Sequence, residues 1–422
     1  MHAAHSNNIG NSFPGPVAGE KLFPATDLVW GGGRALVERL VTDPPAGALY
    51  CLNLRVLSEL VHSALKTLPT PYYAVKANSH PCILEEMARL GLTRFDIASL
   101  EELTAVQAIL PDATCAFMNP IKSVQEIRTA HHLGVNAFAL DSMAEMERLL
   151  KALPESSRCT FLVRIAVNQA DAAYNMSGKF GATREESVAL LRQLAAHGVA
   201  TGITFHVGSQ CLDPSAYDKA ITEASRILKA AATPLTVLDV GGGFPARHRH
   251  TLSHLEWYGK AIRKALDRHK VTFGPALTVQ SEPGRCLVAH AGSVAVQIKA
   301  RKQNLLVLSD GRHGLLSDLW WMHGLHPMRR ILCHTGHPPD RTTTGNPYSL
   351  FQLAGPTCDS HDFFPGPYSL PHDMAEGDWL EIGCLGAYCL ELATRFNGYG
   401  SHQFMTVTPP NDHNHPADPE NI

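Results

Sequence analysis

The sequence lacks the features that direct a chain into or onto a membrane. No run approaches the roughly 18 apolar residues that a membrane-spanning helix requires. Residues 1–20 are polar and rich in glycine and proline, without the apolar core of a secretory signal peptide. The formal charge is only −3, so electrostatics gives no reason to expect nucleic acid or an acidic lipid surface as a partner.

Cysteine pairs and common nucleotide-binding motifs are also missing. The 422 residues include ten cysteines but no CxxC pair, which favours reduced thiols in the cytoplasm over disulfides. Neither GxxxxGK(S/T) nor GxGxxG occurs, so binding of ATP or of a dinucleotide is poorly supported. Two groups of histidines lack a thiolate at ligand spacing, so we expect no metal site. These histidines are His248, His250 and His254, and separately His334 and His337. The reduced thiols and the absence of a signal peptide lead us to expect a cytoplasmic enzyme.

A regular alternation of strands and helices runs through the middle of the chain. Short β-rich runs alternate with amphipathic stretches such as CILEEMARLGL and SMAEMERLLKAL. Alternation over about 240 residues is typical of a parallel α/β domain, and its length suits a (β/α)8 TIM barrel. Nine runs are found where a barrel has eight strands, so one run is not a strand or is a strand outside the barrel. The runs are Leu49–Leu54, Tyr72–Val75, Arg94–Ala98, Cys115–Met118, Ala137–Leu140, Phe161–Ile165, Gly202–Val207, Leu235–Val240 and Leu277–Gln280.

The pattern changes after about Gly292. The strand-like runs SVAVQIKA, NLLVLSD and DWLEIGCL are joined by loops rich in Gly, Pro and His, which predicts a second, mostly antiparallel β-domain. We therefore expect a barrel over residues 48–292 and a β-domain formed by residues 21–47 plus 293–408. Residues 1–20 and 409–422 are expected to be disordered tails, and His334–Tyr348 an exposed loop.

Lys76 stands at the end of a predicted strand, in the motif YAVKAN. A lysine held where apolar walls meet a loop can lose hydration, lower its pKa and become an amine nucleophile that forms a Schiff base. The alternative is a lysine whose stem covers the strand end while its charge reaches water. The surrounding residues have to distinguish the two.

Reactive or glycine-rich positions follow other predicted strands directly. Because the active site of a parallel barrel lies at the C-terminal ends of its strands, these residues are expected at one rim. Singly, each has an ordinary structural interpretation. Together, an amine, a glycine loop for a phosphate, an imidazole to stack on a ring and a carboxylate for a ring nitrogen describe a pyridoxal phosphate site. The positions are Asp96, Arg164, His206, Ser209, Asp239, Gly241, Gly242, Gly243, Glu282 and Arg285.

These motifs resemble the eukaryotic-type ornithine decarboxylase family, within the alanine-racemase-like class of pyridoxal phosphate enzymes. The resemblance extends in order from about residue 45 to 400, over YAVKAN, RFDIAS, MNPIKS, SGKFGA, HVGSQC, LDVGGGFP, SEPGR, GPTCDS, GCLGAY and FNG. It implies a pyridoxal-binding barrel with a β-domain, a decarboxylase activity on an amino acid, and a head-to-tail homodimer with active sites at the interface.

The resemblance also implies roles for the matching residues. Lys76 would be the Schiff-base lysine, His206 the ring that stacks on the pyridine, and Glu282 the partner of the pyridine nitrogen. Cys358 of the partner subunit would protonate the substrate α-carbon, and Asp359 would meet the distal end of the substrate. Asp96 and Arg164 would support the lysine and the cofactor face. Phosphate contacts are implied for Ser209, Gly241, Gly242, Gly243, Gly284, Arg285 and Tyr388.

One stretch departs from the family pattern. Ornithine decarboxylases carry Tyr-Asp after an Asp-Gly pair, and counting from Asp310 puts Trp321 and Met322 there. Asp318 is the only nearby carboxylate, and a buried ammonium needs a paired anion. Substrate contacts are thus expected from Asp359, Asp318, Trp321 and Met322, with ornithine or lysine as the substrate. Three alternatives stay open: a less cationic or bulkier amino acid, a non-catalytic regulator resembling the antizyme inhibitors, and a racemase.

Overall fold

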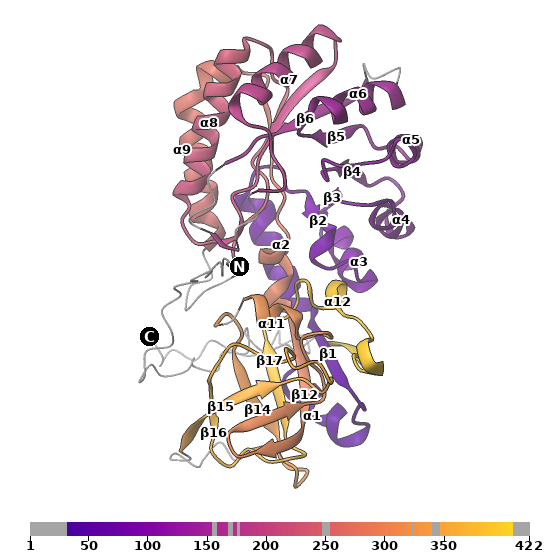
Figure 1. The fold of residues 1–422 in the computed structure, drawn as a ribbon, viewed down its shortest axis with the longest axis vertical. Helices are drawn as coiled ribbons and strands as arrows, with labels where there is room; N and C mark the ends of the chain where they lie inside the picture. Colours follow the sequence, from indigo (N-terminus) through magenta and orange to yellow (C-terminus); the bar gives the residue numbers. More distant parts are fainter. Residues whose placement is uncertain are drawn as a thin grey trace, which may run out of the picture.

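A computed structural model describes residues 32–153, 158–167, 172–174, 178–246, 254–322, 324–339 and 347–407. The described chain forms two lobes, a ring of strands and helices above and a compact sheet structure below (Figure 1). The two predicted tails lie outside the described residues, as do His248, His250 and residues 340–346 of the predicted loop. Within the described part, no helix is both long and apolar enough to cross a bilayer.

The upper lobe is built on an eight-stranded sheet in which every neighbouring pair is parallel. A parallel bridge between Pro71 and Ser281 joins its two ends, and Tyr72 N donates to Ser281 O at 2.8 Å, so the sheet closes into a barrel. This confirms the predicted TIM-like barrel. Its strands are β2 (Tyr73–Ala74), β3 (Arg94–Ile97), β4 (Thr114–Phe117), β5 (Ala137–Leu140), β6 (Thr160–Arg164), β8 (Ala200–Thr204), β10 (Val237–Asp239) and β11 (Thr278–Gln280).

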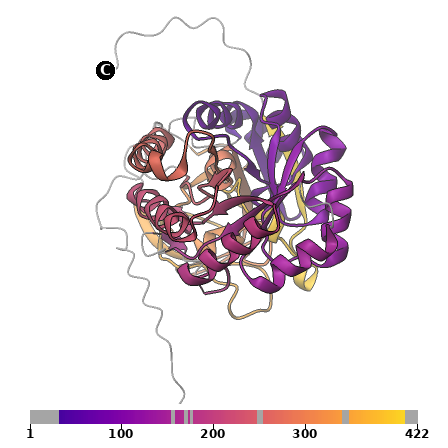
Figure 2. The same ribbon diagram turned by 90° about the horizontal axis from the view of Figure 1, so that it is seen from above.

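Helices cover the outside of the barrel, and Figure 2 shows them as a ring around the strands. Several begin at a Ser or Thr whose side chain accepts a hydrogen bond from a glutamate backbone N–H three residues on, as at Ser123 and Thr183. These caps start each helix soon after a strand, so the strand ends stay free to carry polar residues. The helices are α2 (Leu54–Thr67), α3 (Pro81–Arg89), α4 (Leu100–Ile109), α5 (Val124–His132), α6 (Met143–Ala152), α7 (Arg184–Ala196), α8 (Ser215–Ala231) and α9 (His254–Phe273).

The lower lobe is a second eight-stranded sheet, mixed but mostly antiparallel, as predicted. Among the strand pairs of this sheet that lie in the described residues, two are parallel and the others antiparallel. Short helices α1 (Gly33–Thr42), α10 (Arg285–Val288), α11 (Ser317–Trp321) and α12 (Cys389–Leu392) accompany it. The sheet contains β1 (Ala48–Asn53), β12 (Gly292–Lys302), β13 (Leu305–Leu308), β14 (Met328–Leu332), β15 (Tyr348–Ala354), β16 (Tyr368–Pro371), β17 (Trp379–Gly383) and β18 (His402–Val407). A separate pair is formed by β7 (Ala172–Tyr174) and β9 (Ser209–Cys211).

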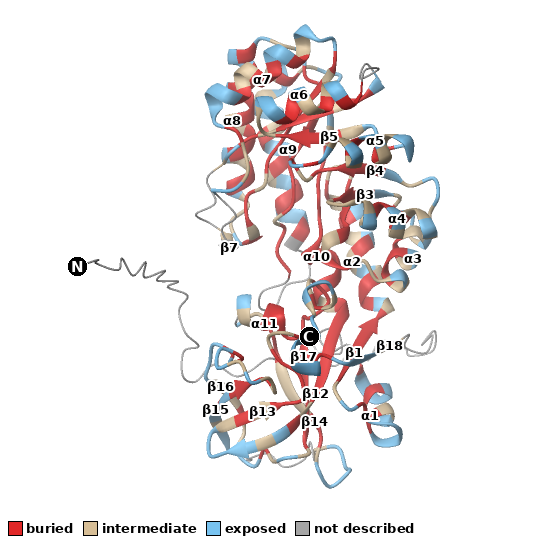
Figure 3. Ribbon diagram, turned by 45° about the vertical axis from the view of Figure 1, so that its right-hand side comes forward, coloured by how far each residue is buried: buried red, intermediate tan, exposed pale blue. Residues whose placement is uncertain are grey.

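The surplus run in the predicted barrel is Leu49–Leu54, and placing it there was wrong. It forms β1, which pairs antiparallel with β12 and parallel with β18 in the lower sheet. All six of its residues are buried, so its apolar run looks like a barrel strand in sequence. Figure 3 shows the buried strands running through both lobes, and the largest cluster of buried apolar side chains is shared between them.

Candidate active site

The segment that carries Lys76 is bound to both lobes. Lys76 lies in a short turn of 3₁₀ helix, Val75–Ala77, directly after β2. Next to it, Asn78 Nδ2 donates to Gly386 O at 2.8 Å and to Tyr50 Oη at 3.2 Å, both in the lower lobe. Tyr388 N donates to Ala77 O at 2.7 Å. Because these contacts come from distant parts of the chain, the Lys76 backbone is held at the junction of the lobes.

The Lys76 amine pairs with a buried carboxylate. Nζ lies 2.9 Å from Asp96 Oδ2, and Asp96 is almost fully buried at the end of β3. Burial alone would lower the pKa of Lys76, but Asp96, Glu282 and Tyr388 outweigh it and hold the pKa above its ordinary value. The expected lowering of the Lys76 pKa was therefore wrong, because two acids stand at the same rim. Lys76 is thus a paired cation, and its side chain is also 39% exposed.

Asp239 and Glu282 are buried acids at the same rim. Asp239 ends β10 and is fully buried, accepting from Gly241 N at 2.7 Å and from Gln280 Nε2 at 2.8 Å. Burial, together with the Asp239 and Asp96 carboxyls, raises the pKa of Glu282 well above its ordinary value. A buried carboxyl in such a place is stabilised by a cationic or N–H partner, which is the chemistry that a pyridine nitrogen offers.

His206 and Arg164 stand beside a cavity of about 250 Å³. The cavity is lined by residues 164–167, by residues 178–181 and by His206. Burial, Arg164 and Lys76 lower the pKa of His206 well below its ordinary value, so the imidazole is neutral. Its Nδ1 accepts from Gly208 N at 3.0 Å, which fixes the ring. A neutral ring held in this way can pack against a flat ligand.

The glycine loop after β10 presents backbone donors. The carbonyls of Gly241, Gly242 and Gly243 accept from Glu282 N, Tyr217 Oη and Cys211 N at 2.8–2.9 Å, so they face the protein. Among the described residues, the N–H groups of Gly242 and Gly243 have no protein acceptor. A side chain does not fit here, since a Cβ on Gly242 would lie 2.7 Å from Glu282 O. Such a loop can bind an anion such as phosphate.

Gly241→Ala is expected to destabilise the protein more than an ordinary glycine replacement. Gly241 has φ +66°, and a Cβ there would also collide with the carbonyl oxygen of Phe205. Gly274 is the matched control, because its φ is +77° but nothing lies within 4 Å of its Cβ position. A left-handed backbone costs a non-glycine residue roughly 1–2 kcal/mol. We expect about this loss for Gly274→Ala in urea unfolding, and at least twice as much for Gly241→Ala. Equal losses would contradict the tight packing of the loop.

Arg285 and Asp318 form a buried ion pair. Arg285 Nη1 and Nη2 lie 2.5 and 2.9 Å from the two Asp318 oxygens, and the two side chains are only 6% and 3% exposed. The guanidinium also lies over the Tyr388 ring at 4.8 Å. The pair gives no support to a phosphate contact by the Arg285 side chain or to a substrate contact by Asp318, and both roles stay predictions. Each group already has the other as its partner.

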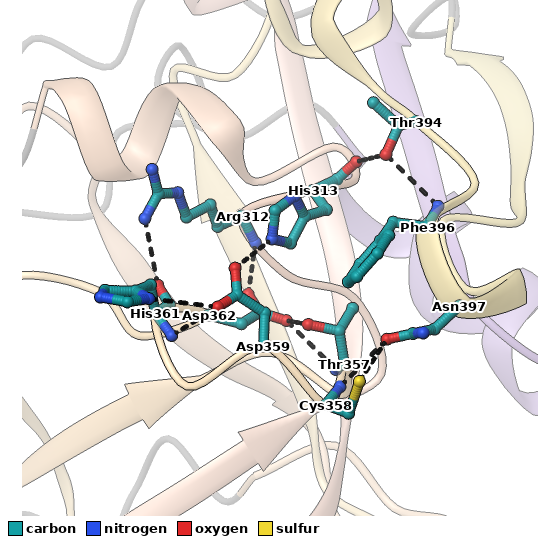
Figure 4. Close-up of polar contacts among 10 residues, drawn as sticks. All are labelled: Arg312, His313, Thr357, Cys358, Asp359, His361, Asp362, Thr394, Phe396 and Asn397. Carbon is teal, nitrogen blue, oxygen red and sulfur yellow. Dashed lines mark hydrogen bonds and ion pairs between the residues drawn. The ribbon is translucent and has the colours of Figure 1, made fainter.

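Cys358 and Asp359 lie in a second cluster, built from three loops (Figure 4). Cys358 is exposed, and its Sγ and backbone N both donate to Asn397 Oδ1 at 3.1 Å. Asp359 Oδ2 accepts from His313 Nε2 at 2.8 Å. Backbone N–H donation from His361 and the hydrogen bond from His313 lower the pKa of Asp359 to about 2. The cluster thus presents a thiol next to a firmly ionised carboxylate.

The loop that carries Cys358 is organised by Asp362, which sequence reasoning missed. Asp362 is 1% exposed, and its carboxylate accepts from Arg312 N at 2.8 Å and from Thr357 Oγ1 at 2.7 Å. Its backbone N also donates to Asp359 O at 3.0 Å. The only local signal is a second Asp three residues after Asp359. Sequence alone gives no partner for it, because Arg312 lies about 50 residues away.

One segment connects the two clusters. Tyr388 N binds Ala77 O beside Lys76, and α12 follows directly from Tyr388. Beyond α12, Thr394 N donates to His313 O at 2.7 Å, and Asn397 holds Cys358. Figure 1 places α12 where the lower sheet meets the barrel. A shift in this segment would therefore move both clusters.

The remaining candidate residues lie near these clusters. Ser209 begins β9, next to Gly208, whose carbonyl packs against Gly243. Gly284 precedes α10. Trp321 is half exposed at 48%, whereas Met322 is buried at 6%. Met322 is thus a buried apolar residue and Trp321 a partly exposed aromatic one, and their predicted substrate contacts stay predictions.

The residues at the rim fit pyridoxal phosphate. Among the described residues, Asp96 Oδ1 is a buried oxygen without a hydrogen-bond partner. The cradle of Gly241 to Gly243 leaves no room for side chains and offers backbone donors. An amine, a neutral imidazole and a buried acid complete the donor set that this cofactor needs. The fold and this site define a class: pyridoxal-binding barrel proteins with a second β-domain.

The comparisons with known proteins narrow this class to one family. Residues 54–289 match the family described as "Pyridoxal-dependent decarboxylase, pyridoxal binding domain", and the chain belongs to the pyridoxal-dependent decarboxylase family that includes ornithine, lysine and arginine decarboxylases. The lysine/ornithine decarboxylase of Selenomonas ruminantium is 32% identical over 382 residues, which is 82% of this chain and 92% of that protein.

Two further relatives widen the comparison. Antizyme inhibitor 2 of Xenopus laevis is 32% identical over 405 residues, covering 90% of this chain and 84% of that protein. The crystal structure of the Paramecium bursaria Chlorella virus arginine decarboxylase bound to agmatine superimposes with a TM-score of 0.77 at 26% identity, covering 88% of this chain and 99% of that one. The family thus contains both decarboxylases and a protein named as an inhibitor of antizyme.

Proposed function

We propose that this protein is a pyridoxal phosphate-dependent α-decarboxylase of a basic L-amino acid, with ornithine or lysine as the substrate. The observation that carries the proposal is the Lys76–Asp96 pair, which lies at one rim with His206, Glu282 and the Gly241–Gly243 loop. The names of the relatives support a basic substrate. We propose further that the enzyme acts as a cytoplasmic homodimer.

Each rim residue has a proposed task. Pyridoxal phosphate supplies an aldehyde that bonds to amines and a ring that accepts electrons as carbon dioxide leaves. Lys76 provides the amine that holds the cofactor, and Asp96 orients that amine at 2.9 Å. His206 would pack on the ring, Arg164 would support the cofactor face, and Glu282 would keep the ring nitrogen protonated. The phosphate would be bound by Ser209, the glycine loop, Gly284, Tyr388 and the backbone of Arg285.

Cys358 is proposed to hold a proton at Sγ for the substrate α-carbon, and Asp359 to receive the distal end of the substrate. Cys358 is exposed and lies in the second cluster, so a second copy of the chain is the proposed source of the thiol that meets Lys76. Asp359 is adjacent and ionised, which suits a group that orients a cation.

A second candidate is the same reaction on a less cationic or bulkier amino acid. One observation favours it: Asp318 is committed to Arg285, and Met322 is apolar where a carboxylate was expected. A non-catalytic regulator is supported by the antizyme inhibitor relative, but Cys358 and Glu282 are the groups that a decarboxylase needs. A racemase is disfavoured by Glu282, because a carboxylate at the ring nitrogen suits loss of carbon dioxide.

Release of carbon dioxide from a panel of L-amino acids tests the proposal. The cofactor-loaded protein is incubated with each amino acid in turn. We expect release from ornithine or lysine, because their length and distal amine match the substrates named for the relatives. Release of carbon dioxide from uncharged amino acids alone would refute the basic substrate and favour the second candidate. No release from any amino acid would overturn the enzyme assignment and favour the regulator.

A further inference from the structure

The Asp359 carboxylate, proposed above as the distal anchor, already has protein donors on both oxygens. Oδ2 accepts from His313 Nε2 at 2.8 Å. Oδ1 accepts from the backbone N of His361 at 2.9 Å, and His361 Nδ1 lies 3.2 Å away. Because an ionised carboxylate only accepts hydrogen bonds, the His313 Nε2 atom must carry the hydrogen in either charge state. Each Asp359 oxygen thus already accepts from the protein before any substrate reaches it, and a substrate ammonium has to share that oxygen.

His313 is held in this position by contacts on its other sides. Its ring lies against Phe396, with the ring centres 5.0 Å apart. Its carbonyl accepts from Thr394 N at 2.7 Å and from Thr394 Oγ1 at 2.9 Å. Figure 4 shows the imidazole directed at Asp359 from the loop after β13. The hydrogen bond is therefore built into the loop and is not a chance meeting of two mobile side chains.

An arginine and two imidazoles already lie around Asp359. Arg312 donates to His361 O at 3.2 Å and lies over the Trp320 ring at 4.2 Å, so a cation stands close by. The nearest buried acid, Asp362, is used by Thr357 and Arg312. A distal ammonium that approaches Asp359 meets one arginine and two imidazoles, and it must compete with His313 for Oδ2.

We propose that His313 is a specificity-determining residue, whose hydrogen bond to Asp359 reduces the preference of the site for a distal ammonium over an uncharged distal group. The inference rests on the proposed function, because it assigns Asp359 to the distal end of the substrate. It deepens that function by stating which residue sets the tolerated charge. His313 acts through Asp359 and takes no part in the reaction at the α-carbon.

The test compares two substrates of equal shape. L-Norleucine carries a methyl group where L-ornithine carries its distal ammonium. His313→Phe keeps a ring against Phe396 but removes the donor to Asp359. We expect the ratio of kcat/KM for ornithine to that for norleucine to rise about tenfold or more, because hydrogen bonds to charged groups have effects of this size. The change should lie mainly in KM for ornithine.

Three controls keep the test decisive. His313→Gln restores a side-chain N–H donor and should return the ratio towards that of the wild type. His334→Phe removes an imidazole that lies 2.9 Å from Asp378, a similar pair elsewhere in the same lobe, and should leave the ratio unchanged. Thermal unfolding checks that each variant is folded. An unchanged or lower ratio in His313→Phe, with wild-type unfolding, would overturn the inference.

A binding measurement separates this inference from the proposed function. Calorimetry on the cofactor-loaded protein gives the affinities for 1,4-diaminobutane and for its isostere pentylamine, without turnover. The ratio should shift towards the diamine in His313→Phe by a similar factor. If the protein shows this shift but releases no carbon dioxide, the decarboxylase assignment is refuted and the proposed role of His313 is retained. Turnover without any shift would refute the role of His313 alone.

Discussion

Replacing Lys76 with alanine should abolish covalent attachment of pyridoxal phosphate and reduce decarboxylation by a factor on the order of 10³ or more, as loss of a covalent nucleophile commonly does. Lys76 lies 2.9 Å from Asp96 and within reach of the charge of Glu282. Its backbone is bound to both lobes, so the amine has a defined position. The variant should still fold, because the Lys76 side chain is 39% exposed and packs little.

Borohydride reduction followed by intact-mass measurement gives a readout that does not depend on activity. The wild-type protein should gain the mass of one reduced cofactor per chain, and Lys76→Ala should gain none. Lys179→Ala is the matched control, since Lys179 lines the cavity next to His206 and should not change the mass gain. Retained mass in Lys76→Ala, or its loss in Lys179→Ala, would contradict the assignment.

Replacing Asp318 with asparagine should lower the free energy of unfolding by about 3–5 kcal/mol, the range for removing one partner of a buried ion pair. The substitution leaves the Arg285 guanidinium buried without an anion. Among the described residues, Arg285 Nε is already a buried donor without an acceptor, so no nearby group replaces the lost carboxylate. His326 Nε2 lies 3.6 Å from Asp318 and cannot supply a negative charge.

Urea unfolding of the cofactor-free protein measures this loss. Asp373→Asn is the control, because Asp373 also pairs with an arginine, Arg330, but is 43% exposed. Exposed pairs contribute roughly 0–1 kcal/mol, so this variant should change little. The double change Asp318→Leu with Arg285→Met should recover much of the lost stability, since it removes both charges. Similar losses for Asp318→Asn and Asp373→Asn would show that the buried pair does not stabilise the fold.

Lys76 could be identified from the sequence, whereas the partner of Asp318 could be identified only from the structure. Lys76 could be singled out from YAVKAN because a strand ends just before it, and other reactive residues follow other strands. Asp318 was expected to meet substrate because it was the only carboxylate near Met322 in the sequence. Its partner Arg285 lies 33 residues earlier and was itself expected to hold a phosphate. Proximity along the chain therefore did not reveal that Arg285 is the partner of Asp318.

The second sheet, too, could be predicted from the sequence only in part. Its mostly antiparallel character could be predicted, because its strands follow one another without long helices. The place of β1 could not, since its pairing with β18 joins residues more than 350 positions apart. A strand buried on both faces has the same apolar pattern in either sheet, so local periodicity does not separate the two.

The sequence by itself determined the barrel and the set of residues at its rim. Alternating strands and capped helices are local patterns, and they bring Lys76, Asp96, His206 and Glu282 to one end because parallel strands all end there. Only the tertiary structure decided which charges pair. Arg285 of α10 pairs with Asp318 of α11, and His313 of one loop pairs with Asp359 of another. Such pairs depend on how distant segments of the lower lobe pack together, and no repeat along the chain encodes them.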